Sequence, residues 1–309
     1  MRALAVTNPN ATAMSPRTRD VIVRALGSEL KVDVAETMGR GHAADLAAQA
    51  RADQFDLVIA VGGDGTVNEI VDGLLRVGVG TDVPRLAVVP GGSANVFARA
   101  LGLPAEPIEA TGVVLERLRA GHERRIGLGL IEADGLRRCF TFSAGFGLDA
   151  EIVREVERRR EKGARSTPGL YMRSGLRQFV ATDRRHPALT VEPETGEPIE
   201  GVFMAIVTNT TPWTYFGDRA LQPTPDASFE TGLDAYLLHR LSTLGTANKL
   251  RRLFAGAAPG GRHATSLHDE SVLTIRSTRP AGVEVDGDFL GEYKLLRLTS
   301  IPEAIAVIS

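Results

Sequence analysis

Two glycine-rich segments contain the residues of this sequence best suited to binding phosphate. The first runs from Gly62 to Thr66 with the sequence GGDGT, and the second runs from Pro90 to Asn95 with the sequence PGGSAN. Glycine allows a close backbone approach, so bare N–H groups at the start of a helix can reach an anion. Asp64 adds a carboxylate that can orient Mg2+ or its water shell. The pattern favours phosphate binding, although a plain glycine turn between a strand and a helix remains the alternative.

The elements around these segments predict how they are positioned. Short apolar runs near Leu57–Val61 and Leu86–Val89 lead directly into them, and helical patterns follow. Two more strands are expected near Leu4–Thr7 and Lys31–Ala35. Alternating strands and helices are typical of a doubly wound parallel sheet, in which ligands bind at the carboxyl ends of the strands. Asn8, at the end of the first predicted strand, is a third candidate at that edge.

The first predicted helix has a clear beginning. Ser15 followed by Pro16 fits a helix cap with proline at the first helical position. Its expected buried stripe consists of Val21, Ile22, Ala25, Leu26 and Leu30.

The sequence pattern changes near Gly121. From there, alternating apolar residues separated by Pro and Gly predict a mainly antiparallel β domain, a sandwich. Helical sequence interrupts it over residues 149–181 and again over 242–257. We therefore expect an α/β domain over residues 1–121 and a β domain with helical insertions over 122–291. Whether about 292–309 returns to the first domain is left open.

Composition excludes several classes of protein. The single cysteine, Cys139, allows neither an internal disulfide nor a cysteine-based metal cluster. A net charge of −2 indicates no nucleic-acid partner, and no apolar run is long enough for a transmembrane helix. Neither a dinucleotide fingerprint nor a P-loop lysine is present. No export signal is evident, so we expect a cytoplasmic protein.

Taken together, these segments resemble the diacylglycerol kinase catalytic domain family. The resemblance rests on GGDGTVNEIVDGLL at 62–75 and PGGSANVFARALGLP at 90–104, and it continues through 142–153, 215–238 and VEVDGD at 283–288. It implies a nucleotide-binding α/β domain, a β-sandwich domain and an active site in the cleft between them. It also implies ATP and Mg2+ as cofactors, and phosphoryl transfer to a lipid hydroxyl, with diacylglycerol converted to phosphatidate in phospholipid metabolism.

The resemblance assigns roles residue by residue. Asp64 would organise magnesium, through water, and the family's proton-accepting glutamate falls on Asp288. Aspartate is shorter by one methylene, about 1.5 Å of reach, so Asp286 or Asp64 could share the role of base. Without the resemblance, an Asp-Gly pair between apolar strands predicts only a hairpin turn. The implied nucleotide-binding residues are Asn8, Thr37, Gly62, Gly63, Asp64, Gly65, Thr66, Val67, Asn68, Glu69, Gly92, Ser93 and Asn95.

A second, regulatory Mg2+ site is also implied by the resemblance. It falls near Ser228, Thr231 and Leu233. Thr231 supplies no carboxylate at the position where the family commonly has an aspartate.

Residues 154–186 are the candidate for contact with a lipid surface. They contain ten Lys or Arg against four acids, with apolar residues such as Leu176 and Val180 between them. Such a surface favours anionic headgroups, so we expect transient contact with the inner face of the membrane, where the lipid substrate is presented. A solvated helix face is the alternative. The oligomeric state is left open, with a homodimer among the possibilities.

Two other functions remain as alternatives. NAD kinase shares the GGDGT turn on a related two-domain fold, but Asn68 and Glu69 directly after the turn argue against it. A nucleotide-binding regulator with little or no turnover would account for the aspartate at 288 and the threonine at 231.

Overall fold

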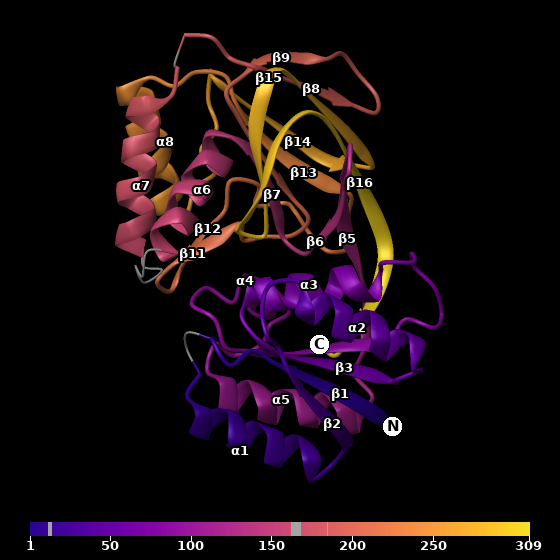
Figure 1. Cartoon of the computed structure of the whole chain (residues 1–309). Coiled ribbons are helices and arrows are strands. Elements are labelled where there is room, and N and C mark those ends of the chain that lie inside the picture. The colour runs from indigo at the N-terminus through magenta and orange to yellow at the C-terminus, as the bar shows by residue number, and fades with distance from the viewer. Residues whose placement is uncertain (12–13, 162–167, 184) are drawn as a thin grey trace. The chain divides into compact units, whose positions relative to one another are not determined.

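The computed structural model describes residues 1–11, 14–161, 168–183 and 185–309 (Figure 1). Contacts divide the chain into two compact units. The first contains Met1–Leu128 together with Glu303–Ser309, and the second contains Gly129–Pro302. The last residues of the chain are thus part of the N-terminal unit.

The first unit is built on a parallel sheet. Its strands are β1 (Arg2–Thr7), β2 (Lys31–Glu36), β3 (Leu57–Gly62) and β4 (Arg85–Pro90), in the order β4-β3-β1-β2. The end of β16 (Asp288–Val307) extends this sheet, because Val307 pairs with Leu86 in parallel. The helices of the unit are α1 (Pro16–Gly27), α2 (His42–Ala52), α3 (Asp64–Leu74), α4 (Val96–Ala100) and α5 (Pro107–Ala120).

Helices cover both faces of this sheet. α1 and α5 lie on one face, and α2 and α3 lie on the other (Figure 1). Every residue of β3 is buried, as expected for a central strand covered on two sides. The predicted doubly wound α/β arrangement is confirmed.

Local signals place the beginning of α1 as predicted, but only part of the expected stripe is buried, since Ala25 and Leu30 are partly exposed and Leu30 lies beyond the helix. The Ser15 side chain accepts a hydrogen bond from the Thr18 backbone N–H at 3.0 Å, and Pro16 begins the helix. Ile22 and Leu26 are buried, but Val21, expected in the same stripe, is 45% exposed. That expectation was wrong because Ile22 and Leu26 are one turn apart and face the sheet, whereas Val21 points about 100° away from Ile22.

The second unit is rich in antiparallel strands. The described order is β14-β13-β10-β7-β15-β16, with β8 and β9 added beside β15 and β6 beside β5. Its strands are β6 (Leu136–Phe140), β7 (Ser143–Gly147), β8 (Leu189–Pro193), β9 (Ile199–Val202), β10 (Met204–Thr208), β11 (Thr214–Phe216), β12 (Arg219–Leu221), β13 (Leu233–Leu238), β14 (Ala264–Glu270) and β15 (Val272–Val285), together with the parts of β5 (Arg124–Ala133) and β16 that follow Leu128 and precede Glu303. The prediction of a mainly β second half is confirmed.

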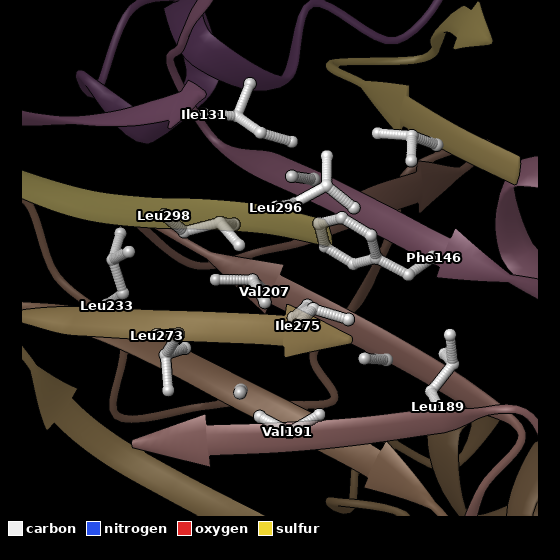
Figure 2. Packing of buried hydrophobic residues seen from close by; sticks show 14 of the residues in the cluster. Ile131, Phe146, Leu189, Val191, Val207, Leu233, Leu273, Ile275, Leu296 and Leu298 are labelled. Atoms are coloured by element: carbon white, nitrogen blue, oxygen red, sulfur yellow. The ribbon is translucent and has the colours of Figure 1, made fainter. Parts of the chain in front are cut away.

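The long strand β15 explains how this unit encloses a core. Its first half pairs with β8 and its last residues pair with β7, with a register irregularity between Arg276 and Ala281. Side chains from both halves meet in one cluster, where Phe146 packs among aliphatic residues such as Ile275 and Leu296 (Figure 2). Both halves of β15 therefore line the core of the second unit.

Helices interrupt the second unit where the sequence predicts them. α6 (Leu148–Glu161) and α7 (Pro168–Ala181) occupy the first interruption, and α8 (Thr243–Phe254) follows its cap residue Ser242. Across the residues that the structure describes, no helix is long and apolar enough to cross a membrane.

Candidate active site

The first glycine turn connects β3 to α3 at the carboxyl edge of the parallel sheet. The helix begins at Asp64, and its cap residue Gly63 supplies no side chain to the first N–H groups. Thr66, buried in the first turn, accepts a hydrogen bond from the Asn8 side-chain amide at 3.1 Å. Asn8 in turn follows β1, so the ends of two neighbouring strands are joined here.

The second glycine turn lies directly against the first. The Gly91 backbone N–H donates to the Gly62 carbonyl at 2.8 Å. A Cβ atom placed on Gly92 would lie 2.7 Å from the Gly63 Cα, closer than real Cβ contacts. The two backbones therefore touch in a way that only glycine permits, and their bare amides form a cradle suited to phosphate.

Asn95 closes the second turn. It adopts a left-handed conformation with φ of 49° and is buried. Its side chain accepts from the Gly92 N–H at 2.8 Å and donates to the Gly92 carbonyl at 2.9 Å. Asn95 thus shapes the loop, while Ser93 is exposed beside it.

The side chain of Asp64, in the first turn, is hydrogen-bonded to the helix that follows the second turn. Its Oδ1 atom accepts a hydrogen bond from the Phe97 backbone N–H at 3.1 Å, so it caps the start of α4 from outside that helix. It is also the acidic residue in the first turn of α3, where a carboxylate is favoured by the helix dipole. This is a single carboxylate beside an amide cradle, which fits a Mg2+ ion that keeps most of its own water.

Glu69 holds a third loop at the same edge. Its two oxygens accept from the Gly41 N–H at 2.8 Å and the Ala43 N–H at 3.2 Å. Gly41 provides no side-chain cap to α2, so the Glu69 carboxylate takes that place. Thr37 lies in the preceding loop, where its N–H donates to the Thr7 carbonyl. Glu69 therefore positions the loop that contains Thr37.

The remaining residues implied for nucleotide binding lie along the start of α3. Val67 and Asn68 are 1% exposed, while Gly65 is partly exposed. The structure thus brings the implied set together at one edge of the first unit; their role toward a nucleotide remains a prediction.

The acidic turn of the second unit joins β15 to β16. Asp286 and Gly287 both have positive φ, 49° and 84°, and Val285 pairs with Asp288 across the turn. This is the geometry of a tight two-residue hairpin. Asp288 is half-buried at the first position of β16.

Asp286 is enclosed by donors. Its carboxylate accepts from the Thr141 N–H at 2.7 Å and hydroxyl at 2.8 Å, and from the N–H groups of Phe142 and Ser143 at 3.0 Å each. Burial raises the pKa of Asp286, and these backbone donors act in the opposite direction. The contacts make Asp286 an anchor between the hairpin turn and the start of β7.

Two further acids of this unit were not predicted as site residues from the sequence. Asp149, the second residue of α6, and Glu284, on β15, are both buried. The sequence signal for Glu284 is an acid set between the apolar residues Val283 and Val285 at the end of β15. No local signal singles out Asp149.

The residues implied for a regulatory metal form a turn before β13. The Ser228 hydroxyl bonds the Glu230 carboxylate, and the Thr231 hydroxyl donates to the Ser228 carbonyl at 3.1 Å. Leu233 begins β13 and pairs with Glu270 of β14. Within the described ranges, no group of three or more His, Cys, Asp or Glu residues is arranged to hold a metal ion.

The candidate lipid-contact segment folds into α6 and α7, except that residues 162–167 and 184 lie outside the described residues. Buried Glu155 pairs with Arg159 at 2.8 Å and lies 3.7 Å from Arg177 of α7, which ties the two helices together. On α7, Leu176 and Val180 are 67% and 69% exposed, one helical turn apart.

Comparison with known proteins identifies the family. A profile described as the diacylglycerol kinase catalytic domain matches residues 2–131. A diacylglycerol kinase from Mycobacterium tuberculosis is 30% identical over 284 residues, which cover 90% of this chain and 85% of that protein. A protein of Chromohalobacter salexigens named probable lipid kinase YegS-like is 43% identical over 144 residues, 46% of this chain but only 43% of the relative.

Solved structures show the same fold. A diacylglycerol kinase from Bacillus anthracis aligns over 99% of this chain and 96% of its own, with a TM-score of 0.70 at 18% identity. An NAD kinase from Archaeoglobus fulgidus in complex with ATP aligns over 100% and 94%, with a TM-score of 0.54 at 11% identity. Because the mycobacterial relative is matched along most of its length, the chain belongs to the diacylglycerol kinase family of lipid kinases.

Proposed function

We propose that this protein transfers the γ-phosphate of ATP to the hydroxyl group of a lipid, converting diacylglycerol to phosphatidate. The observation that carries the proposal is the backbone contact between Gly63 and Gly92, which leaves two amide-rich turns side by side at a strand edge. We infer that a lipid accepts the phosphate because the chain belongs to a family of lipid kinases.

Candidate residues can be named for phosphate binding, metal binding and proton transfer in the proposed reaction. The amides of both glycine turns and the start of α3 would hold the phosphates. Asp64 would hold Mg2+ through water, and the ion would neutralise charge on the phosphates. Asp288 would accept the proton as the lipid oxygen bonds to the γ-phosphorus and the bond to the β-phosphate oxygen breaks, releasing ADP.

A labelling experiment tests this function. The full chain is incubated with γ-labelled ATP, Mg2+ and vesicles that contain diacylglycerol, with ceramide, sphingosine and NAD in parallel reactions. Labelled phosphatidate is expected from the first reaction only. Label in NAD alone would mean that the protein is an NAD kinase and not a lipid kinase. The absence of labelled product in every reaction would refute the proposed function.

Two variants separate binding from transfer. Asp64→Ala is expected to remove labelled product, and Asp288→Asn to remove it while the protein still binds ATP. An inactive parent chain that gains activity with Asp288→Glu would support the regulator alternative instead.

We further propose that α6 and α7 contact an anionic lipid surface. On α7, the exposed apolar side chains Leu176 and Val180 lie beside Arg177, whose side chain is 64% exposed. Apolar side chains can enter the headgroup region while arginines bind the anionic groups beside them.

A further inference from the structure

Two carboxyl groups of the second unit occupy one small space above β7. Gly145 pairs with Glu284 of the adjacent β15. A Cβ atom placed on Gly145 would lie 2.0 Å from Asp149 Oδ2 and 2.6 Å from Glu284 Oε1. The two acids therefore converge over the bare Cα of one glycine, and they are only 5% and 2% exposed.

Among the described residues, no cation neutralises this pair. Asp149 Oδ2 is buried without a hydrogen-bond donor. Arg154 of α6 binds Glu292 at 2.8 Å and Glu151 at 3.6 Å. The charges that act on Glu284 besides Asp149 are those of Asp286 and Asp288, and both are acidic.

The two buried carboxyl groups can lie this close together if the pair binds one proton. Two ionised carboxylates in a dry site repel each other and lose their hydration, whereas one protonated partner donates a hydrogen bond to the other. Burial raises the pKa of Asp149 to about 7. Burial and the neighbouring Asp149 charge likewise raise the pKa of Glu284.

The pair is also connected to the acidic turn. Glu284 Oε2 accepts a hydrogen bond from the Gly287 N–H at 2.8 Å. Gly287 lies between Asp286, which is anchored to residues 141–143, and Asp288, the proposed base. Glu284 thus holds the turn at a second point, one residue from the group that would take the lipid proton.

We propose that Asp149 and Glu284 share one proton and act as a positioning pair, which fixes the turn through Gly287 and thereby places the Asp288 carboxylate. The proposal rests on the proposed lipid kinase activity for its catalytic consequence. When the shared proton is lost to solvent at alkaline pH, repulsion separates the two carboxylates and loosens the turn.

Substitutions at Glu284 test the positioning role. Glu284→Gln keeps an oxygen for the Gly287 N–H and an amide donor for Asp149, so kcat should stay near the parent value and lose its alkaline decline. Glu284→Ala removes both contacts, so kcat should fall about tenfold or more while the KM for ATP stays unchanged. Glu197→Gln, the same change at an exposed position of the same unit, should behave as the parent chain.

A titration that does not depend on activity tests the shared proton. Carboxyl NMR of the full chain should show two coupled ionisations that extend above the ordinary range of Asp and Glu, and in Glu284→Gln a single uncoupled ionisation of Asp149 should remain. Parent and Glu284→Gln chains with the same titration and the same pH profile would overturn the proposal. So would a folded Glu284→Gln chain as slow as Glu284→Ala. If the parent phosphorylates no lipid, the proposed function fails, while the titration still decides the shared proton.

Discussion

The carboxylate of Asp64 accepts a hydrogen bond from the Phe97 backbone N–H at 3.1 Å, so the helix after the first glycine turn is joined to the helix after the second. This bond and the contact between Gly63 and Gly92 hold the two turns in one orientation. A cradle that is already formed loses little freedom when a phosphate binds.

Gly92→Ala should weaken ATP binding. The added methyl would meet the Gly63 Cα at 2.7 Å, and backbone cannot yield as a flexible side chain can. We expect the Kd for a non-hydrolysable ATP analogue to rise about tenfold or more by calorimetry. Gly112→Ala is the matched control: nothing lies within 4 Å of its new Cβ, and alanine in α5 should add roughly 1 kcal/mol of stability. Unchanged affinity in Gly92→Ala would contradict the cradle.

Glu69→Gln should destabilise the first unit. The amide keeps one acceptor but directs an N–H group toward the N–H of either Gly41 or Ala43. We expect a loss of about 1 to 3 kcal/mol in the free energy of unfolding, measured in urea. Glu116→Gln, at an exposed position of α5, should change stability by less than about 0.5 kcal/mol. Equal stabilities of the two variants would show that Glu69 does not cap α2.

The stability of the protein should depend on pH through Asp149. Burial raises its folded pKa to about 7, so between about pH 4 and pH 7 the folded chain binds more protons than the unfolded chain. Stability from this group therefore falls as pH rises through that window. Asp149→Asn should remove the loss, on the order of 4 kcal/mol at pH 7, when unfolding is measured at several pH values.

The control for that measurement is Asp218→Asn, which changes an exposed acid in the second unit. It should follow the parent chain at every pH. A parent chain and an Asp149→Asn chain with parallel stability curves would mean that Asp149 ionises normally in the folded protein.

Leu176→Ser combined with Val180→Ser should weaken association with anionic vesicles. Both side chains are more than 65% exposed on α7, so the change should cost little stability. We expect a several-fold loss of binding in vesicle sedimentation, because apolar area contributes alongside the arginines. Val77→Ser, at a 79% exposed position of the first unit, is the control. Identical sedimentation of all three chains would remove α7 as the lipid-contact surface.

The strands of the first unit and both glycine turns were predictable from the sequence because their signals are local. Apolar runs ending in Gly62 and Pro90 indicate buried strands, and glycine is the residue that a tight turn before a helix needs. The Asp286–Gly287 hairpin was readable in the same way. The rule that parallel strands end at one edge then placed Asn8 near Thr66.

The roles of the acids were decided by tertiary structure. Asp286 bonds Thr141 across 145 positions of sequence, and Glu69 caps a helix that precedes it in the chain. Asp149 and Glu284 meet only because β7 and β15 pair in the register that sets Gly145 opposite Glu284. The residue type determines which charge a side chain can have. Strand register and burial then decide which groups surround it. Those neighbours determine whether the charge is anchored, shared or available to a substrate.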